Sequence, residues 1–226
     1  MEIEKYLTSL TYPGRTILAG KDENGSLFYA YAIMGRSEHS RNRIFKKEAN
    51  KIKTVAFDES LLKDPHLIIY NAVIREDGQE IFTNGDQTDT IYQGLLDGKT
   101  FASSLESREY EDDAPAYTPR ISGMFKDHVL SLSILRRKQE NCERSSWTYE
   151  NITPNTYYII HTYEDDGTPL PSFQGDPRPL EIKGTMTAEK LCHLVFDSLH
   201  DDNKISVYAA QVGGEEYMIN KKQGDK

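Results

Sequence analysis

Cysteine is scarce in this chain, with only Cys142 and Cys192 among 226 residues. Two thiols so far apart in sequence provide neither a disulfide framework nor a pair of metal ligands, so we expect free thiols in a reducing compartment. Long apolar runs are also missing, because runs such as Leu67-Ile68-Ile69 are far too short to cross a bilayer. The first four residues, Met1-Glu2-Ile3-Glu4, lack the basic and apolar regions of a secretory signal. These absences predict a cytoplasmic protein with no membrane partner.

An excess of positive charge is absent as well. The chain has 27 Lys and Arg against 36 Asp and Glu, a formal net charge of −9. Nucleic-acid binding depends on neutralising phosphates with basic side chains, so no nucleic-acid partner is expected. The net charge does not exclude binding of a small phosphorylated ligand, since such a ligand needs only a local basic pocket. The length suits a single domain over residues 1–226, with a frayed charged tail at Lys221–Lys226.

Signatures of metal and cofactor chemistry are missing too. No ligand-type spacing occurs among the six histidines, His39, His66, His128, His161, His193 and His200. The segment Gly94–Thr100 is one residue too short for a phosphate-binding P-loop and lies within helical sequence. The acidic runs at 111–113 and 164–166 lack the alternating oxygen ligands of a calcium loop and fit solvated loops. We therefore expect no metal and no cofactor.

Turn signals between apolar runs predict several strand hairpins. Asn24-Gly25, Asp77-Gly78 and Gly213-Gly214 favour the positive φ angles of tight turns. The predicted strand pairs are 15–21 with 26–35, 67–75 with 80–83, 121–125 with 129–135, and 205–212 with 216–220, and a further strand is predicted at 156–162. Helices are predicted at 187–200, capped by Thr187, and over about 89–107, interrupted near Gly98. The polar stretch Arg136–Asn155 is interpreted as a long excursion between strands. Many hairpins and few helices indicate an α+β protein with antiparallel sheets, two of which would pack face to face with helices outside.

Two polar segments adjoin apolar strands in the first half of the chain. After Met34 come Arg36, Ser37, Arg41, Asn42 and Arg43, and the planar forks of arginine match phosphate oxygens or a polarised carbonyl. A solvated charged loop is the alternative. In the second segment an apolar run presents Tyr70 and Asn71 on opposite faces of a strand. The alternative there is a core tyrosine followed by a capping asparagine.

Two further segments carry more polar side chains than a turn requires. The first lies between a strand and a helix and includes Asn84, Gly85, Asp86, Thr88 and Asp89, and Thr88 or Asp89 could cap that helix.

The second runs from Arg108 to Ile121. Glu109 and Glu111 have the spacing that one extended segment directs to the same side, and two close carboxylates suit acid–base chemistry. A solvated loop is again the alternative. Tyr110, Thr118 and Arg120 belong to this segment.

These segments together resemble the archaeal-type IMP cyclohydrolases and their bacterial relatives. The matching strings are Gly35-Arg36-Ser37, Asn42-Arg43, Tyr70-Asn71, Asn84-Gly85, Thr88-Asp89-Thr90-Ile91, Tyr110-Glu111 and Thr118-Pro119-Arg120-Ile121, with Thr162-Tyr163-Glu164 as a weaker match. The resemblance implies a four-layer αββα sandwich of two mainly antiparallel sheets, similar to the N-terminal-nucleophile hydrolases but without their self-processed nucleophile. An initiator Met before the bulky Glu2 is expected to be retained, which agrees with that exception.

The resemblance also implies an activity, the closure of 5-formamidoimidazole-4-carboxamide ribotide (FAICAR) to IMP with loss of water. On this basis Arg43, Tyr70, Glu109 and Glu111 are the candidate catalytic residues, with Glu111 moving protons and Glu109 as its partner. The candidate substrate-binding residues are Arg36, Ser37, Asn42, Asn71, Asn84, Gly85, Asp86, Thr88, Asp89, Tyr110, Thr118 and Arg120, with Arg36 or Arg120 on the 5′-phosphate. The partner would be a small purine ribotide, and a homo-oligomer is compatible with the sequence. A purine-nucleotide-binding protein without turnover and an amide hydrolase of related fold are the alternatives.

Overall fold

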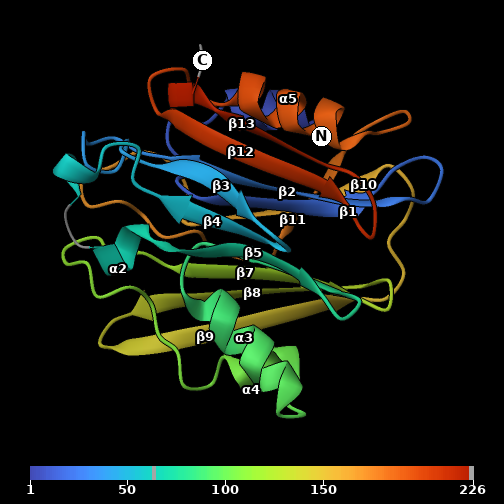
Figure 1. Ribbon diagram of the computed structural model, residues 1–226, viewed down its shortest axis with the longest axis horizontal. Coiled ribbons are helices and arrows are strands. Elements are labelled where there is room, and N and C mark those ends of the chain that lie inside the picture. The colour runs from blue at the N-terminus through green and yellow to red at the C-terminus, as the bar shows by residue number, and fades with distance from the viewer. Residues whose placement is uncertain (63–64, 224–226) are drawn as a thin grey trace.

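Two antiparallel sheets form the body of the protein, whose computed structural model describes residues 1–62 and 65–223 (Figure 1). In spatial order the six-stranded sheet contains β11 (Arg178–Glu181), β10 (Thr156–His161), β1 (Thr16–Lys21), β2 (Leu27–Met34), β12 (Lys204–Gln211) and β13 (Glu216–Asn220). The seven-stranded sheet contains β3 (Ile44–Glu48), β4 (Lys51–Val55), β5 (Tyr70–Glu76), β6 (Gln79–Thr83), β7 (Arg120–Lys126), β8 (Val129–Lys138) and β9 (Asn141–Tyr149). The predicted α+β class with antiparallel sheets is confirmed.

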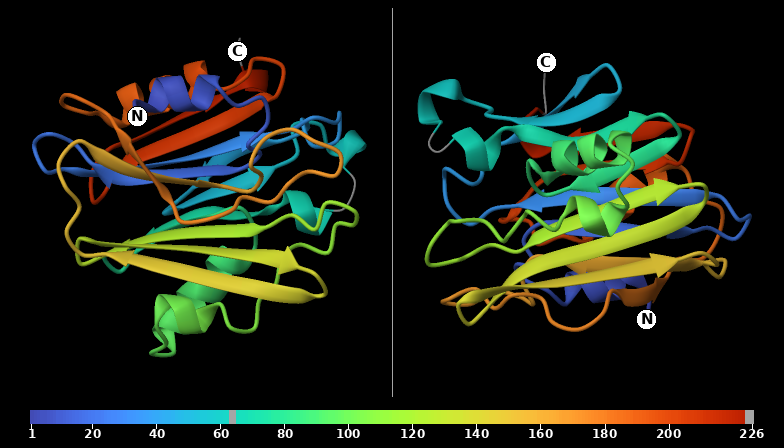
Figure 2. Two further views of the ribbon diagram at one scale, coloured as in Figure 1. Left: turned by 180° about the vertical axis from the view of Figure 1, so that it is seen from behind. Right: turned by 90° about the horizontal axis from the view of Figure 1, so that it is seen from below.

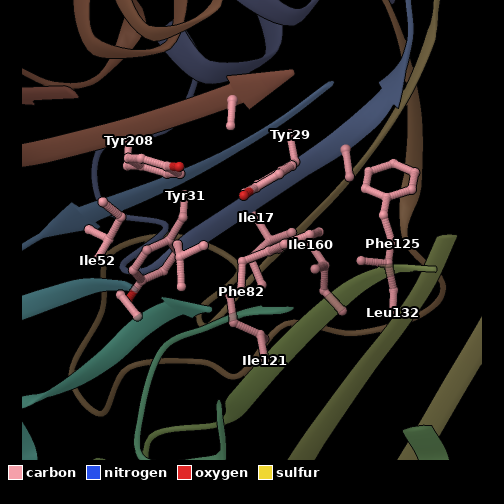
Figure 3. Close-up of a cluster of buried hydrophobic side chains, with 14 of the residues drawn as sticks. Ile17, Tyr29, Tyr31, Ile52, Phe82, Ile121, Phe125, Leu132, Ile160 and Tyr208 are labelled. Carbon is pink, nitrogen blue, oxygen red and sulfur yellow. The ribbon is translucent and has the colours of Figure 1, made fainter. Parts of the chain in front are cut away.

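The main hydrophobic core lies between the two sheets (Figure 3). Tyr29 of β2 stacks on Phe82 of β6 with ring centroids 4.1 Å apart, and Phe125 of β7 packs beside both rings. Gly123 makes this packing possible, because a Cβ atom there would lie 2.0 Å from the Phe82 ring. Aromatic stacking across the interface therefore fixes how the sheets face each other.

Helices cover the outer face of each sheet (Figures 1 and 2). Helices α1 (Ile3–Thr8) and α5 (Ala188–Ser198) pack against the six-stranded sheet, and α3 (Gln87–Leu96) and α4 (Phe101–Ser104) against the seven-stranded sheet. The Thr187 side chain accepts a hydrogen bond from the Lys190 N–H, which confirms the predicted N-cap of α5. Because both faces of β2 are covered, all eight of its residues are buried. Among the described residues, no helix combines the length and apolarity needed to span a membrane.

Several predicted boundaries were wrong. Leu67 belongs to the short helix α2 (Pro65–Ile68), so the strand expected at 67–75 begins only at Tyr70. The expected excursion at 136–155 is instead the end of β8 and the strand β9, which pairs along nearly the full length of β8. Strand β9 lies at a sheet edge with side chains partly accessible on both faces, so its sequence lacks a clear alternation of apolar and polar residues.

Other elements were absent from the prediction. The hairpin of β3 and β4 and the strand β11 were not foreseen, nor were α1 and the short 3₁₀ helix η1 (Glu59–Leu61). At the chain end, Lys221–Gln223 form a second 3₁₀ helix, η2, rather than a frayed segment. The rest of the predicted tail, 224–226, lies outside the described residues.

Candidate active site

A cavity of about 380 Å³ opens at one end of the two sheets. Its walls come from the start of β1, the loop after β2, helix α2, the segment before β7 and the segment after β10. Strands β1 and β2 pair antiparallel, so the end of β2 lies beside the start of β1, and the segment before β7 reaches the same cavity from the facing sheet. The structure brings five predicted residues to this cavity, namely Arg36, Ser37, Arg43, Glu111 and Thr118.

An arginine that the prediction missed binds the central carboxylate. Nη2 of Arg15, just before β1, lies 2.9 Å from both Oε1 and Oε2 of Glu111. Arg15 is 6% exposed and Glu111 is 3% exposed. Burial raises the pKa of the Glu111 carboxyl, and the positive charges of Arg15 and Arg120 oppose that rise. A carboxyl with a raised pKa beside a fixed cation is suited to accept and return a proton.

Arg43 and Tyr70 lie close to this pair. Arg43 is 4% exposed, and its Nε donates to the Ser40 carbonyl oxygen at 2.9 Å. Within residues 1–62 and 65–223, no carboxylate forms an ion pair with Arg43. Arg43 therefore adds a buried positive charge to the cavity wall.

Tyr70 lies beneath the cavity rather than in its wall. Its hydroxyl is 2.8 Å from the Tyr31 hydroxyl, and its ring packs in the core between the sheets. Burial raises the Tyr70 pKa, and the nearby charges of Arg15 and Arg43 oppose that rise. As predicted, Tyr70 and Asn71 point to opposite faces of β5: the Asn71 amide donates to Asp89 of α3 at 2.9 Å, on the outer face of the sheet.

Asn84 supports Glu111 from behind. Its Nδ2 donates to the Pro119 carbonyl oxygen at 2.9 Å and lies 3.5 Å from Oε1 of Glu111. Its Oδ1 accepts from the Ile121 N–H at 2.8 Å and from the Gln87 amide at 3.0 Å. With its hydrogen-bonding capacity used in this way, Asn84 positions the Glu111 segment rather than offering free groups to a ligand.

The predicted phosphate-binding role does not suit Arg120. Its Nη1 lies 2.7 Å from Oε1 of Gln87 and 2.9 Å from Oδ1 of Asp86, and Arg108 binds the same Asp86 oxygen. Gly85 lies close beside this cluster, and a Cβ atom there would lie 2.4 Å from Nη1 of Arg120, so a larger residue would displace the end of the Arg120 side chain. The cluster lies outside the cavity wall, so the structure does not bring Arg120, Asp86 or Gly85 to the cavity.

The remaining residues of the 84–89 segment build the turn into α3. Thr88 is buried and its hydroxyl pairs with that of Thr83 at 2.6 Å. Thr88 and Asp89 lie inside α3, whose N-cap is Asp86, so the expectation that either caps this helix was wrong.

Asn42 and Ser37 organise the loop after β2. The Asn42 amide donates to the Asp58 carbonyl oxygen and accepts from the Asp58 N–H, both at 2.8 Å. The Ser37 hydroxyl lies 3.1 Å from that of Ser40. Ser37 reaches the cavity, while Asn42 holds the loop from outside it.

Glu109 and Glu111 do not form the expected pair. The Glu109 side chain is 65% exposed and lies 3.8 Å from Arg144. Glu111 turns inward because its N–H donates to the Thr118 carbonyl oxygen, which closes a loop in place of one extended run. Tyr110 packs edge-on against Tyr117, also away from the cavity.

The sequence interpretation also missed a cluster of residues at the cavity mouth. The guanidinium of Arg36 lies over the Tyr12 ring, 5.0 Å from its centroid, and forms an ion pair with Asp166. Tyr12 stacks on Tyr163, with 5.9 Å between the ring centroids. Two signals were present, the acidic run at 164–166 and the match at Thr162-Tyr163-Glu164, but local sequence did not link them to Arg36. In the described part of the chain, no group of three His, Cys, Asp or Glu side chains could hold a metal ion.

Comparison with known proteins gives a consistent result. A family model described as "IMP cyclohydrolase-like protein" matches residues 12–216. A protein named IMP cyclohydrolase from Methanocaldococcus jannaschii is 32% identical over 120 residues, covering 52% of this chain and 58% of that protein. The protein of the same name from Methanosphaera stadtmanae is 31% identical over 170 residues, 70% of this chain and 83% of its own length. A third, from Methanopyrus kandleri, is 34% identical over 120 residues, 49% of this chain and 57% of that protein.

Proposed function

Because this chain belongs to the IMP cyclohydrolase-like protein family, we propose that it closes FAICAR to IMP with loss of water. The observation that carries the proposal is the buried Arg15–Glu111 pair in the wall of a cavity that also contains Arg36 and Arg43. A cavity of about 380 Å³ lies within the range of pockets that bind small molecules. Relatives named for the same activity support the assignment.

The reaction requires no nucleophile from the protein. The carboxamide nitrogen of the substrate attacks its own formyl carbon, and a C–N bond forms while the formyl oxygen gains negative charge. The attacking nitrogen loses one of its two protons and the formamido nitrogen loses its single proton. Both protons go to the oxygen, which leaves as water while a C=N bond forms to the former formamido nitrogen, and the ring becomes a pyrimidinone. The protein must hold the two groups together, stabilise the oxyanion and move protons.

Glu111 is the group that moves protons in this proposal. It accepts a proton from the attacking nitrogen and returns one to the departing oxygen. Its burial raises its pKa, which brings its proton affinity closer to that of the groups it serves. Arg15 keeps the carboxylate oriented through both oxygens, and Asn84 supports it from behind.

Arg43 supplies positive charge to the developing oxyanion. It is buried, and its Nε is anchored on Ser40, so its remaining guanidinium N–H groups are available to the cavity. Tyr70 and Tyr31 form the polar floor beneath it. Removal of one oxyanion donor typically costs about 100- to 1000-fold in rate, so we expect Arg43→Ala to lose most of kcat while the protein remains folded.

Arg36 is the stronger candidate for the 5′-phosphate. Its side chain is 39% exposed at the cavity mouth, where a charged phosphate keeps contact with solvent. Arg120 is engaged by Asp86 and Gln87 outside the cavity. Ser37 adjoins Arg36 and offers a hydroxyl to the same phosphate.

The layer order supports a finer description of the fold. Helices, sheet, sheet and helices follow one another, as in the αββα sandwich of the N-terminal-nucleophile hydrolases, and we extend the proposal to that relationship. The free thiols of Cys142 and Cys192 fit a reducing compartment such as the cytoplasm.

A direct assay tests the proposed function. Purified protein is incubated with FAICAR, and the absorbance of the hypoxanthine ring is followed with Arg43→Ala as a comparison. We expect rapid conversion by the wild-type protein and a loss of about 100-fold or more by the variant. Binding of IMP without any conversion would instead favour a nucleotide-binding protein, and release of ammonia from an amide substrate would favour an amide hydrolase.

A further inference from the structure

A chain of three polar side chains leads from the cavity wall towards its rim. The Tyr163 hydroxyl lies 2.6 Å from the Thr118 hydroxyl, and the Thr118 hydroxyl contacts Oδ2 of Asp113. The other oxygen of Asp113, Oδ1, accepts the Thr118 backbone N–H at 2.7 Å. All three residues line the cavity, and Tyr163 and Thr118 are 2% and 1% exposed.

The direction of these hydrogen bonds follows from the chemistry of their ends. An ionised carboxylate can only accept, so the single hydroxyl proton of Thr118 must be donated to Asp113. Thr118 then has only lone pairs for Tyr163, and the short Tyr163–Thr118 contact requires the phenol proton. The phenol proton is directed away from the ligand space, and the Tyr163 oxygen can offer only a lone pair to the cavity.

Packing contacts hold the Tyr163 ring in place, so the direction of its hydroxyl proton is fixed relative to the cavity. It stacks on Tyr12 on one side, and Gly14 passes against its edge, where a Cβ atom would lie 2.7 Å from the ring. The Tyr163 carbonyl oxygen is bound by the buried His161. Burial raises the pKa of Tyr163 to about 12, so the phenol keeps its proton at neutral pH.

We propose that Tyr163 is a substrate-positioning residue, set as a hydrogen-bond acceptor by Thr118 and Asp113, that binds the N–H of the reacting carboxamide nitrogen. This inference rests on the proposed function and identifies a group that the assignment of Glu111 and Arg43 leaves unspecified. In the product the same nitrogen is N1 of IMP, which carries a hydrogen. In AMP the corresponding N1 has a lone pair and no hydrogen. A fixed acceptor at Tyr163 therefore favours IMP over AMP.

One substitution reverses the chain without changing its shape. In Asp113→Asn the amide oxygen can still accept the Thr118 N–H, while the amide nitrogen takes the place of Oδ2 and donates to the Thr118 hydroxyl. Thr118 then donates to Tyr163, and the phenol proton turns towards the cavity. Asp112→Asn is the matched control, because it removes the same charge from an exposed neighbour outside the cavity wall.

The test is calorimetric titration of IMP and AMP into each variant, which does not depend on turnover. We expect the wild-type protein and Asp112→Asn to bind IMP about 10-fold or more tightly than AMP, since a mismatched buried acceptor loses roughly that factor. Asp113→Asn should abolish or invert this preference, and Tyr163→Phe should remove it. In the Tyr163→Phe background, Asp113→Asn should have no further effect on the ratio.

Several results would overturn the inference. The first is equal binding of IMP and AMP by the wild-type protein. The second is a folded Asp113→Asn variant with the wild-type ratio of IMP to AMP affinity. The third is an Asp113→Asn effect on that ratio that is as large in the Tyr163→Phe background as in the wild-type protein. If Asp113→Asn does not fold, Thr118→Val breaks the chain instead and should lose the preference that Thr118→Ser retains; a retained preference in Thr118→Val contradicts the inference. A wild-type protein that binds neither nucleotide would overturn the proposed function together with this inference, whereas turnover of FAICAR without an IMP preference would overturn the inference alone.

Discussion

Nη2 of Arg15 lies 2.9 Å from both carboxylate oxygens of Glu111, a residue 96 positions further along the chain. Both side chains are almost fully buried, and their segments come from different sheets. Such a pair costs desolvation energy, and it seldom stabilises a protein more than apolar packing would. The position of the pair in the cavity wall points to a functional role rather than a stabilising one, because a buried carboxylate held by a cation is suited to proton transfer.

Removal of one partner of this pair should destabilise the folded protein. We expect Arg15→Ala to lower the free energy of unfolding by about 3–5 kcal/mol at pH 7, because Glu111 would remain buried without its cation. The double variant Arg15→Ala/Glu111→Gln should recover a large part of that loss, because the buried charge is then absent. Urea unfolding followed by circular dichroism measures both. A loss below about 1 kcal/mol in the single variant would contradict the paired arrangement.

The ion pair between Arg36 and Asp166 leads to a prediction about affinity. Asp166 occupies the guanidinium that we assign to the 5′-phosphate, so it competes with the substrate. Asp166→Asn should lower KM for FAICAR severalfold and leave kcat nearly unchanged. Stability should change by less than about 1 kcal/mol, because both side chains are well exposed. Asp197 is an exposed carboxylate on α5, so Asp197→Asn controls for the change in net charge. A higher KM in Asp166→Asn would exclude competition between Asp166 and the substrate.

Buried His161 should make the protein sensitive to acid. Its Nε2 lies 2.6 Å from the Tyr6 hydroxyl, and burial lowers its pKa from 6.5 to about 4. Between these values the unfolded chain binds a proton that the folded protein does not, so stability falls as the pH drops from about 6.5 to 4. The contribution is about 3 kcal/mol over that window.

Denaturant midpoints measured across pH 4–7 test this contribution. His161→Gln should flatten the dependence in that window even if it lowers stability at pH 7. His193→Gln, half exposed on α5, should leave the dependence as in the wild-type protein. Parallel curves for His161→Gln and the wild-type protein would show that another group is responsible.

The local sequence pattern was sufficient to predict the placement of a residue where that placement depends only on its own strand or turn. The alternation across Tyr70 and Asn71 gave their opposite faces correctly, and Thr187 capped α5 as expected. The four polar segments were recognised from their composition, but only some of their side chains reach the cavity, and Tyr70 begins β5 rather than ending the apolar run that starts at Leu67.

Contacts between residues distant in sequence could not be predicted from local patterns. Arg15 reads as an ordinary residue at a strand start, and only the folded chain shows its contact with Glu111. The expected pairing of Glu109 with Glu111 assumed an extended segment, but the hydrogen bond from the Glu111 N–H to Thr118 closes a loop there. Strand β9 escaped prediction because an edge strand with both faces partly accessible has no clear polar alternation.

The most direct test of the central claim compares two carboxylates that lie two residues apart. The dependence of kcat on pH for FAICAR closure is measured for the wild-type protein, Glu111→Gln and Glu109→Gln. Glu111 is buried in the cavity wall, whereas Glu109 is exposed beside Arg144. The account predicts that Glu111→Gln loses about 100- to 10,000-fold in kcat, together with the acidic limb that lies above the usual glutamate pKa. Glu109→Gln should stay within about twofold of the wild-type rate, because a surface ion pair contributes little. Wild-type turnover by Glu111→Gln, or a comparable loss in Glu109→Gln, would contradict it.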